Sequence, residues 1–406
     1  MKWKIKTMSD IAEPVNGIVD GPFGSNLKKT DYINDSENGI PVLTTKNLHG
    51  DYSKDSVRYV SQEKYEILKR STVFPGDILV AKIGSIGTCG IYPLSCKKAL
   101  IPANLLKISV LSSVDRRFVY YYIQSKGFQE RIKAISTATA QPAFNVTKFR
   151  KLPIPVPPLS EQERIVARIE ELFSQLDAGV ETLKKTKAQL AVYRQAVLKE
   201  AFSKVTKKVS LGSISDSRLG KMLDKEKNVG IPRRYLRNIN VRWFSFDLDD
   251  LLEMRIEENE VDKYTLHRGD LVICEGGEPG RCAVWENDNA IFYQKALHRV
   301  RFIDNSNPKF YMYYLWYAAQ TGELKQLFTG TGIKHLTGQS LVKVQVPIAK
   351  RDKQDRIVDE IESRLSVCDS IEHTVNTALQ QAEAMRQSIL KDAFEGRLKD
   401  EQTNKS

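Results

Sequence analysis

The sequence lacks the features that mark membrane, disulfide-rich and metal-binding proteins. Its apolar runs fall well short of the ~20 residues that a membrane-spanning helix needs, so no membrane partner is expected. Its five cysteines contain no C-x-x-C pair, and its five histidines show no H-x-x-H spacing. A disulfide framework and a zinc site are therefore not expected, and the cysteine pattern fits a reducing cytoplasm.

Motifs of catalysis are also missing. The sequence has no P-loop, and no G-x-G-x-x-G follows a predicted strand. Asp77 followed by Lys82 resembles part of a nuclease core, but Val80 stands where a second carboxylate would hold a divalent ion. The pair Asn307-Pro308 lacks the second proline of a methyltransferase loop, and we interpret it as a turn before a helix. No catalytic residue is identified from these patterns.

The charge balance is strongly positive. The 406 residues carry 62 Lys and Arg against 50 Asp and Glu, which gives a formal net charge of +12. An excess of this size favours a polyanionic partner, above all nucleic acid. The length, with 41% hydrophobic residues, suits a chain of two or three globular domains.

A tandem repeat with an offset of about 192 residues organises the chain. The segment 198–202, Leu-Lys-Glu-Ala-Phe, recurs at 390–394 as Leu-Lys-Asp-Ala-Phe. The segment 162–166, Gln-Glu-Arg-Ile-Val, recurs at 354–358 with one residue changed. Because the register is nearly constant and only two copies exist, the pattern indicates a duplication rather than a solenoid.

The first part of each copy, about 1–150 and about 206–348, predicts strands, turns and one helix. Short apolar and β-branched runs alternate with Gly, Pro, Asn and Asp, which is typical of strands separated by turns. A glycine pair after the clearest strand of each copy indicates a tight turn. The predicted strands are 77–83 and 270–274, the glycines are Gly84, Gly87, Gly277 and Gly280, and the helices are 116–126 and 309–319.

The second part of each copy, 160–204 and 352–396, predicts a long helix. Apolar residues recur every seven positions, so each helix buries a seam against another helix. A helix of about 42 residues measures roughly 60 Å. Ser160 with Glu163, and Asp352 with Asp355, are predicted to cap the two helix starts. The predicted seam consists of Ile169, Leu176, Leu183, Leu190, Val197, Ile361, Cys368, Val375, Ala382 and Ile389.

Together these patterns predict an α+β fold with a pseudo-twofold internal repeat. Two mixed globular domains are separated by two long helices, which pack as an antiparallel coiled coil because an isolated helix of this length needs a partner. The predicted segments are a first globular domain 1–158, a central helical region 159–205, a second globular domain 206–350, a distal helical region 351–398 and a tail 399–406.

Polar and basic residues in loops of both globular parts suit contacts to DNA. Lys and Arg contact phosphates, while Arg, Asn and Gln also bond base edges. The aromatic residues within 118–122 and 310–317 recur at helical spacing, and we interpret them as core rather than as base-stacking groups. The candidate DNA-binding residues are Ser25, Asn26, Lys28, Lys46, Asn47, Lys82, Ser85, Thr139, Gln141, Arg233, Arg234, Arg237, Asn238, Asn240, Arg242, Glu275, Arg281, Lys334 and His335.

A distinctive motif leads into the first long helix. It is P-x-P-P-L-x-E-Q-x-x-I at 155–165, accompanied by a second copy of the region at 347–394 and by Gly-Pro-Phe-Gly-Ser at 21–25. By these residues the chain resembles, over essentially its whole length, the specificity (S) subunit of a Type I DNA restriction–modification system. The second copy departs from the motif, because Ala-Lys-Arg-Asp at 349–352 replaces the proline–leucine stretch.

The resemblance implies two target recognition domains, each recognising one half of a split site in double-stranded DNA. It implies that the helical regions act as spacer and as docking platform for two modification subunits, which bind S-adenosylmethionine and methylate adenine. Restriction subunits that use ATP and Mg join the full complex, and the chain itself binds no cofactor or metal. The residue patterns alone leave two alternatives open, a protein-interaction scaffold without DNA recognition and a self-sufficient methyltransferase or nuclease.

Overall fold

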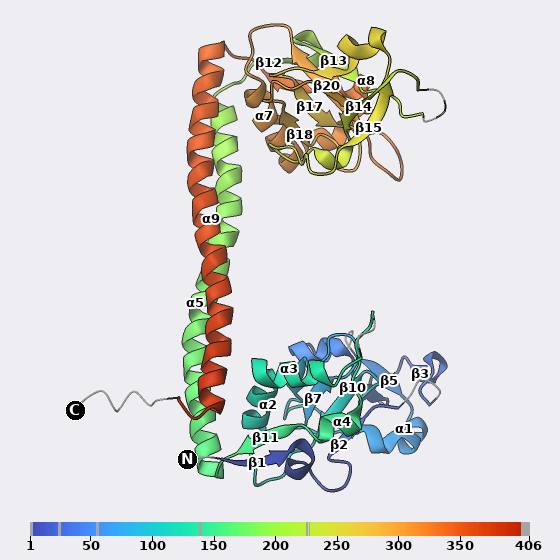
Figure 1. Cartoon of the computed structure of the whole chain (residues 1–406), viewed down its shortest axis with the longest axis vertical. Coiled ribbons are helices and arrows are strands. Elements are labelled where there is room, and N and C mark those ends of the chain that lie inside the picture. Colours follow the sequence, from blue (N-terminus) through green and yellow to red (C-terminus); the bar gives the residue numbers. More distant parts are fainter. Residues whose placement is uncertain are drawn as a thin grey trace, which may run out of the picture. The chain divides into compact units, whose positions relative to one another are not determined.

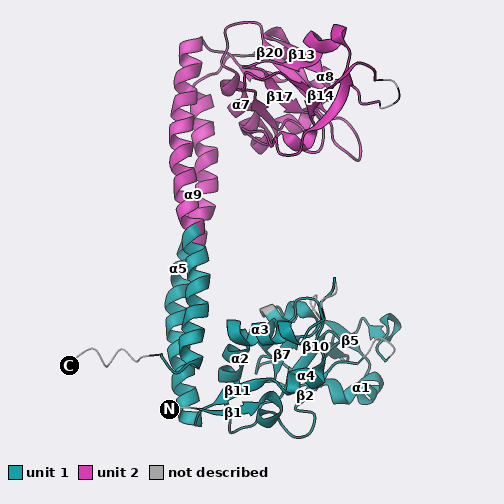
Figure 2. Ribbon diagram, in the orientation of Figure 1, with its two compact units in different colours: residues 1–182, 377–406 teal, residues 183–376 magenta. Residues whose placement is uncertain are grey.

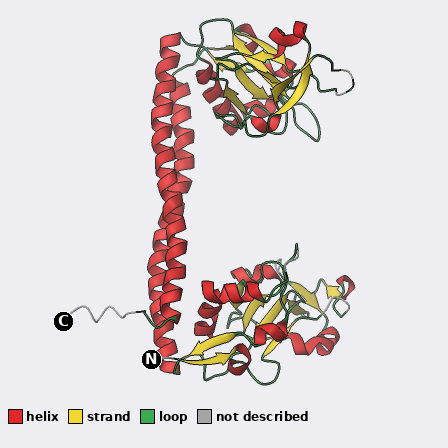
Figure 3. Ribbon diagram, in the orientation of Figure 1, coloured by secondary structure: helices red, strands yellow, loops and turns green. Residues whose placement is uncertain are grey.

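The computed structural model describes residues 3–22, 26–53, 57–137, 140–224, 226 and 228–398 (Figure 1). The chain divides into two compact units (Figure 2). Unit 1 consists of residues 1–182 together with 377–406, and unit 2 consists of residues 183–376. Each unit therefore combines one mixed globular domain with part of both long helices, and Figure 3 shows strands and helices in both.

The globular part of unit 1 contains three sheets. A two-stranded pair has the order β1-β11, a four-stranded sheet has the order β2-β10-β7-β8, and a five-stranded sheet has the order β3-β5-β4-β9-β6. The strands are β1 Lys4–Thr7, β2 Ile18–Asp20, β3 Tyr32–Ile33, β4 Ile40–Val42, β5 Arg58–Val60, β6 Thr72–Val73, β7 Ile78–Ala81, β8 Cys89–Ile91, β9 Ala99–Leu100, β10 Leu105–Ile108 and β11 Pro153–Val156. The helices are α1 Gln62–Leu68, α2 Arg116–Gln124, α3 Lys126–Ala134 and α4 Val146–Arg150, with 3₁₀ turns at Met8–Ile11, Lys29–Asp31, Thr45–His49 and Lys69–Ser71.

Unit 2 repeats this plan, but its described residues form no strand that corresponds to β3. Its sheets have the orders β12-β21, β13-β20-β17-β18 and β15-β14-β19-β16. The strands are β12 Lys208–Ser210, β13 Ser215–Leu219, β14 Ile231–Leu236, β15 Leu252–Ile256, β16 Thr265–Leu266, β17 Leu271–Cys274, β18 Cys282–Val284, β19 Ile291–Tyr293, β20 Leu297–Phe302 and β21 Gln345–Pro347. The helices are α6 Val261–Tyr264, α7 Pro308–Thr321 and α8 Gly338–Leu341, with 3₁₀ turns at Leu211–Ser213, Asn238–Asn240, Glu258–Glu260 and Glu323–Leu327.

The predicted central strand of each copy is buried on both faces. In β7, Ile78 and Val80 join the core beneath α2, whereas Leu79 and Ala81 join a second core behind the sheet. Strand β17 is divided in the same way between two cores. Because successive side chains of a strand point to opposite faces, a strand between two cores is apolar at every position. This explains why the sequence shows a continuous apolar run here rather than an alternating one.

The two long helices are α5 (Leu159–Ser203) and α9 (Arg351–Phe394), and they pack antiparallel in each unit. In unit 1, the Arg386 guanidinium lies 4.5 Å from the ring centroid of Phe173 and pairs with Asp177. In unit 2, three ion pairs follow in opposite chain directions, Lys187–Glu372 at 3.7 Å, Arg194–Asp369 at 2.6 Å and Glu200–Arg364 at 2.8 Å. All ten predicted seam residues are buried or half-buried, so the paired-helix prediction is confirmed.

The predicted capping residues of these helices are wrong. Helix α5 begins at Leu159 and α9 at Arg351, so Ser160 and Asp352 lie inside the first turn. The N–H groups of residues 161 and 162 donate to the carbonyl of Pro158, and the same position in α9 is Lys350. The carbonyl before each helix accepts the first two bonds whether its residue is proline or lysine, so both helices begin one residue earlier than the sequence signal suggested.

The repeated glutamine at the start of each long helix ties that helix to its globular domain. The Gln162 carbonyl oxygen accepts from the backbone N–H of Asp115 at 2.9 Å, and its amide donates to Pro157 O at 2.7 Å. Gln354 makes the equivalent bonds to Asn307 N at 2.6 Å and Ala349 O at 2.9 Å. Both glutamines are 1% exposed, so the conserved spacing of the two copies reflects a structural role.

The repeated Leu-Lys-Glu/Asp-Ala-Phe segments are the places where the ends of the long helices enter the cores. In unit 2, the Phe202 ring lies 5.4 Å from that of Phe310 and 5.3 Å from that of Tyr314. In unit 1, the Phe394 ring lies 5.2 Å from Phe118 and 5.1 Å from Tyr122. The aromatic residues of α2 and α7 thus pack in the core, as their helical spacing predicted.

Candidate nucleic-acid interface

Three segments far apart in the sequence bring predicted DNA-binding residues together in unit 2. The Arg281 guanidinium donates to the side-chain oxygen of Asn238 at 2.7 Å, and the Asn238 amide donates to Gly276 O. The N–H of Leu336 donates to Glu275 O at 2.7 Å. His335 lies against Gly276, where an added Cβ would be 3.1 Å from the His335 Nδ1 atom. We call the four predicted residues Asn238, Glu275, Arg281 and His335 the unit 2 cluster.

The glycine turn after β17 gives the unit 2 cluster its fixed geometry. Gly277 has φ +75° and Gly280 has φ +93°, a conformation that side chains with a Cβ rarely adopt. Glu278 in this turn accepts from Trp243 Nε1 at 2.6 Å and pairs with Arg281 at 3.1 Å. The turn is therefore braced from two sides, and the prediction of a tight turn is confirmed.

A buried histidine lies directly beneath the cluster. His298 is 1% exposed, its Nε2 lies 3.1 Å from Leu336 O, and burial lowers its pKa to about 4 despite that hydrogen bond. At neutral pH the ring is therefore uncharged, although the Glu275 carboxylate lies only 3.8 Å away. The Glu275 carboxyl group is a hydrogen-bond acceptor of the kind that suits a base amino group such as cytosine N4.

The arginines of β14 and the loop behind it are held in surface ion pairs. Arg237 lies 2.6 Å from Asp250, Arg242 lies 3.3 Å from Asp247, and Arg233 lies 3.7 Å from Glu258. Arg234 is exposed on β14 opposite Glu253. Exposed ion pairs contribute about 0–1 kcal/mol. A DNA phosphate can therefore compete for these guanidinium groups at small cost.

Two predicted asparagines brace their own loops instead of facing solvent. Asn240 is 1% exposed, accepts from Arg237 N at 2.8 Å and donates to Asp247 O at 3.0 Å. Asn47 is 0% exposed and bonds Thr44 N and Asp51 O in the same way. A base contact by either amide would have to break these bonds. Each asparagine occupies the N3 position of a short 3₁₀ helix, three residues after the N-cap residue. A side chain at this position commonly bonds the backbone of the cap, and this local pattern could have indicated the structural role.

The remaining candidates of unit 1 are divided between surface loops and one buried ion pair. Asn26, Lys28, Lys46, Ser85 and Gln141 are exposed, and Lys334 in unit 2 is exposed as well. Lys82 is instead 6% exposed, and its ammonium group lies 2.6 Å from Asp20. Ser25 and Thr139 lie outside the described residues.

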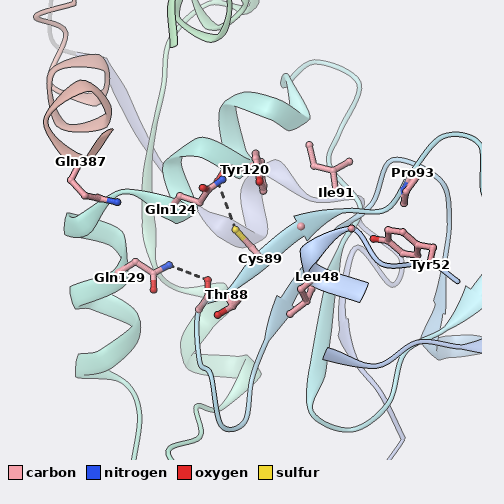
Figure 4. A pocket seen from close by; sticks show the side chains of 13 residues that line it. Leu48, Tyr52, Thr88, Cys89, Ile91, Pro93, Tyr120, Gln124, Gln129 and Gln387 are labelled. Atoms are coloured by element: carbon pink, nitrogen blue, oxygen red, sulfur yellow. Dashed lines mark hydrogen bonds between the residues drawn. The ribbon is translucent and has the colours of Figure 1, made fainter. Parts of the chain in front are cut away.

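The glycine turn of unit 1 is braced by a glutamine. Gln129 donates through Nε2 to Gly87 O at 3.0 Å (Figure 4). The same atom donates to Ile123 O at 2.7 Å. Gln124 and Gln387 line the same cavity, which has a volume of about 770 Å³. The turn after β7 is therefore fixed against α3, much as the turn after β17 is fixed by Trp243.

Asp77, which resembles part of a nuclease core in the sequence, and its counterpart Asp270 in the second copy form ion pairs with residues of neighbouring strands. Asp77 lies 3.4 Å from the Lys107 ammonium, and Asp270 forms two bonds of 2.6 and 2.7 Å to the Arg301 guanidinium. Among the residues described, no three His, Cys, Asp or Glu side chains are placed to hold a metal ion. In the same part of the chain, no helix is both long and apolar enough to cross a membrane.

The sequence comparisons identify the family of this twofold arrangement. Residues 1–191 and 205–381 match the family model of the Type I restriction modification DNA specificity domain. The chain therefore belongs to this family, as the resemblance of its helix-start motif indicated. Each of the two matches covers one globular domain with adjoining helix.

Two curated relatives align with nearly the whole chain. The specificity subunit of the Type I restriction enzyme EcoKI from Escherichia coli (strain K12) is 23% identical over 426 residues, covering 98% of this chain and 89% of the relative. The StySPI specificity subunit from Salmonella potsdam is 25% identical over 418 residues, covering 95% and 88%.

Solved structures share the fold. A chain from a structure that describes complex assembly and conformational transition of the type I R-M system has a TM-score of 0.75 at 16% identity, with 98% of both chains covered. The HsdS subunit from Thermoanaerobacter tengcongensis has a TM-score of 0.55 at 16% identity, covering 98% of this chain and 97% of that one.

Proposed function

We propose that the chain is the non-catalytic DNA-recognition subunit of a Type I restriction–modification complex. Each globular domain recognises one half of a split site in double-stranded DNA. Two modification subunits dock on the helices and supply S-adenosylmethionine chemistry, and restriction subunits supply ATP- and Mg-dependent cleavage. The observation that carries this proposal is the repeat: the four-stranded sheets that contain β7 and β17 have equivalent strand orders, and a glycine turn with polar residues follows each of these strands.

The differences between the two turns support recognition of two different half-sites. Phe144 N donates to Lys82 O in unit 1, and Leu336 N donates to Glu275 O in unit 2, so residues 82 and 275 hold equivalent positions. One position carries a cation and the other an anion. Lys82 is buried against Asp20, whereas Glu275 is partly exposed, so the two turns present different groups to base edges, which themselves differ in donors and acceptors.

The long helices support both docking and spacing. Their outer faces expose apolar side chains, with Val192 67% exposed, Val367 58% exposed and Met385 55% exposed. Exposed apolar groups on a helix pair are a feature of protein–protein interfaces. Helix α5 has 45 residues and α9 has 44, each without a break. Helices of this length are about 65 Å long.

The direct test of recognition uses the complex of this chain with its modification subunits. We expect site-dependent binding to duplex DNA, measured by filter binding, and adenine methylation at one split sequence, found by methylation-sensitive sequencing of host DNA. Binding without any sequence preference, or no DNA binding by an assembled complex, would leave the protein-interaction scaffold as the better explanation.

The spacer role is tested by lengthening both helices together. Seven residues inserted after Thr182 in α5 and after Asn376 in α9 keep the seven-residue seam in phase and add about 10 Å. We expect the spacer of the recognised site to grow by about three base pairs, at 3.4 Å each. The matched control is the same insertion in the tail after residue 398. A preferred spacer that stays the same in both variants contradicts the spacer role.

The non-catalytic role has its own test. The purified chain is incubated with DNA and labelled S-adenosylmethionine, and separately with DNA and Mg²⁺. We expect no transfer of label and no cleavage until the partner subunits are added. Turnover by the chain alone would contradict the proposal.

A further inference from the structure

Unit 1 contains a cavity whose walls carry mostly positive charge. The cavity lies between β2, the turn after β7 and α4, and its volume is about 500 Å³. Four cationic side chains line it, against the single carboxylate of Asp20. The cations are Arg70, Lys82, Lys148 and Arg150.

The walls of this cavity are tied to one another. The Ser71 hydroxyl donates to Asp20 O at 3.1 Å, which fixes the turn that carries Arg70. The Arg150 guanidinium donates to Ile18 O, which fixes α4 against β2. Gly84 N donates to Pro142 O at 2.9 Å, which joins the glycine turn to the loop before α4. The cavity is therefore formed before any ligand arrives, and binding carries little ordering cost.

Most of the positive charge in the cavity has no negative partner. Asp20 pairs with Lys82 at 2.6 Å, and both are largely buried. Arg150 bonds a backbone carbonyl, which leaves its charge uncompensated. Arg70 and Lys148 are exposed at the rim, and within the described part of the chain neither forms an ion pair. Concave walls with charge of one sign focus the field and attract an anion.

Unit 2 provides an internal comparison, because the repeat places different residues at the same positions. The strand register matches Asp20 with Leu219, since their partners Leu106 and His298 occupy equivalent places in β10 and β20. Glu275 stands in place of Lys82, as described above. In the offset of the repeat, Ser340 and Val342 replace Lys148 and Arg150. Lys263 keeps a cation at the position of Arg70, because it likewise lies two residues before the short strand that precedes the shared Gly-Asp. Three of the four cations of the cavity therefore have no cationic counterpart in unit 2, and the shared fold does not require them.

We propose that this cavity of unit 1 binds one phosphate group of the DNA backbone, gripped by Arg70 and Lys148. The inference rests on the proposed function and adds a contact that fixes the first recognition domain on its half-site. The neighbouring Ser85 on the glycine turn and Gln141 on the adjoining loop are exposed. A phosphate held here orients these residues toward the duplex, because phosphate contacts set register while base contacts set specificity.

The test compares the salt dependence of DNA binding by the full complex with modification subunits. The variant Arg70→Ala/Lys148→Ala removes two exposed cations and leaves the Lys82–Asp20 pair intact. The matched control Arg116→Ala/Lys126→Ala removes the same charges from exposed positions of α2 and α3. We expect the slope of log affinity against log salt to become shallower by about 0.9, the value of one phosphate, only in the first variant. The ratio of specific to non-specific affinity stays the same.

Further arms separate the alternatives. Arg70→Lys/Lys148→Arg keeps both charges and is expected to restore the slope. Equal slopes for the wild type, the cavity variant and the control overturn the phosphate proposal. An equal reduction of the slope in the cavity variant and in the control also overturns it. A further outcome is that the wild type is stabilised against thermal unfolding more by inorganic phosphate than by chloride, while the cavity variant keeps the wild-type slope. That result assigns the cavity to a free anion and overturns the proposal of a DNA phosphate. If the wild-type complex itself shows no sequence preference, the proposed function fails instead.

Discussion

Replacing Phe202 by alanine is expected to destabilise unit 2 and leave unit 1 unchanged. Phe202 stands near the end of α5, and its side chain is 6% exposed. Its ring packs edge-on against Phe310 and Tyr314 of α7. The substitution removes a buried ring from the core that also contains Leu271 and Ile273 of β17.

The magnitude follows from burial and ring contacts. Buried Phe→Ala changes typically cost about 3–5 kcal/mol, and favourable aromatic pairs account for about 0.5–1.5 kcal/mol each within such totals. Because Phe202 keeps some exposure, we expect a loss of about 3 kcal/mol. Such a loss raises the exchange of the most protected amides about 10²-fold, at about 1.4 kcal/mol per tenfold change.

Hydrogen exchange followed by mass spectrometry distinguishes the two units. We expect faster exchange in α7 and β17 after Phe202→Ala, with exchange in β7 and α2 unaltered. The matched variant Phe394→Ala should do the reverse, because Phe394 packs on Phe118 and Tyr122 in unit 1. Faster exchange in unit 1 after Phe202→Ala, or unchanged exchange in α7, would refute the assignment of each helix end to its core.

Three further predictions follow from the structure. Unfolding of unit 2 is expected to depend on pH through His298, whose pKa in the folded state, about 4, lies below the ordinary 6.5. Between these values the unfolded state binds more protons, so the free energy of unfolding falls by about 2 kcal/mol from pH 7 to pH 5. Chemical denaturation of the His298→Gln variant between pH 7 and pH 5 should show a smaller pH dependence of the free energy of unfolding. A pH dependence equal to that of the wild type would contradict the role of His298. Gln354→Ala leaves the backbone N–H of Asn307 without its acceptor and should cost about 1–3 kcal/mol by thermal unfolding, whereas Gln345→Ala on the exposed end of β21 should cost little. Leu190→Asp places a charge in the helix seam, where Leu190 is 8% exposed, and should abolish assembly with the modification subunits on a sizing column; an intact complex would contradict the seam.

Much of the architecture could be predicted because it depends on periodic patterns. The seven-residue spacing located both long helices to within two residues, and the continuous apolar runs located β7 and β17. The repeat also predicted that both domains share one plan, which their common strand orders confirm. Such features can be predicted from a sequence because many residues repeat the same apolar spacing, so the pattern does not depend on any single residue.

The candidate interface was harder to predict because it depends on individual side-chain contacts, some local and others distant in the chain. Asn240 and Asn47 have the residue type of base-contacting groups, but local hydrogen bonds bury them. The role of Gln162 depends on Asp115, which lies far upstream. The cationic cavity needs the turn at 69–71, the turn after β7 and α4 to meet. No spacing in the sequence encodes these meetings, since only the folded sheets bring the segments together.

The discontinuous make-up of unit 1 has a consequence for biosynthesis. Unit 2 is one uninterrupted stretch, residues 183–376, whereas the core of unit 1 includes Leu390 and Ala393 of α9. Domains usually fold in the order in which the ribosome releases them. Here the order is inverted at completion: the domain translated first waits, partly open, until the last helix has left the ribosome. A nascent chain cut short after residue 376, within α9, therefore keeps all of unit 2 but lacks the α9 residues of the unit 1 core.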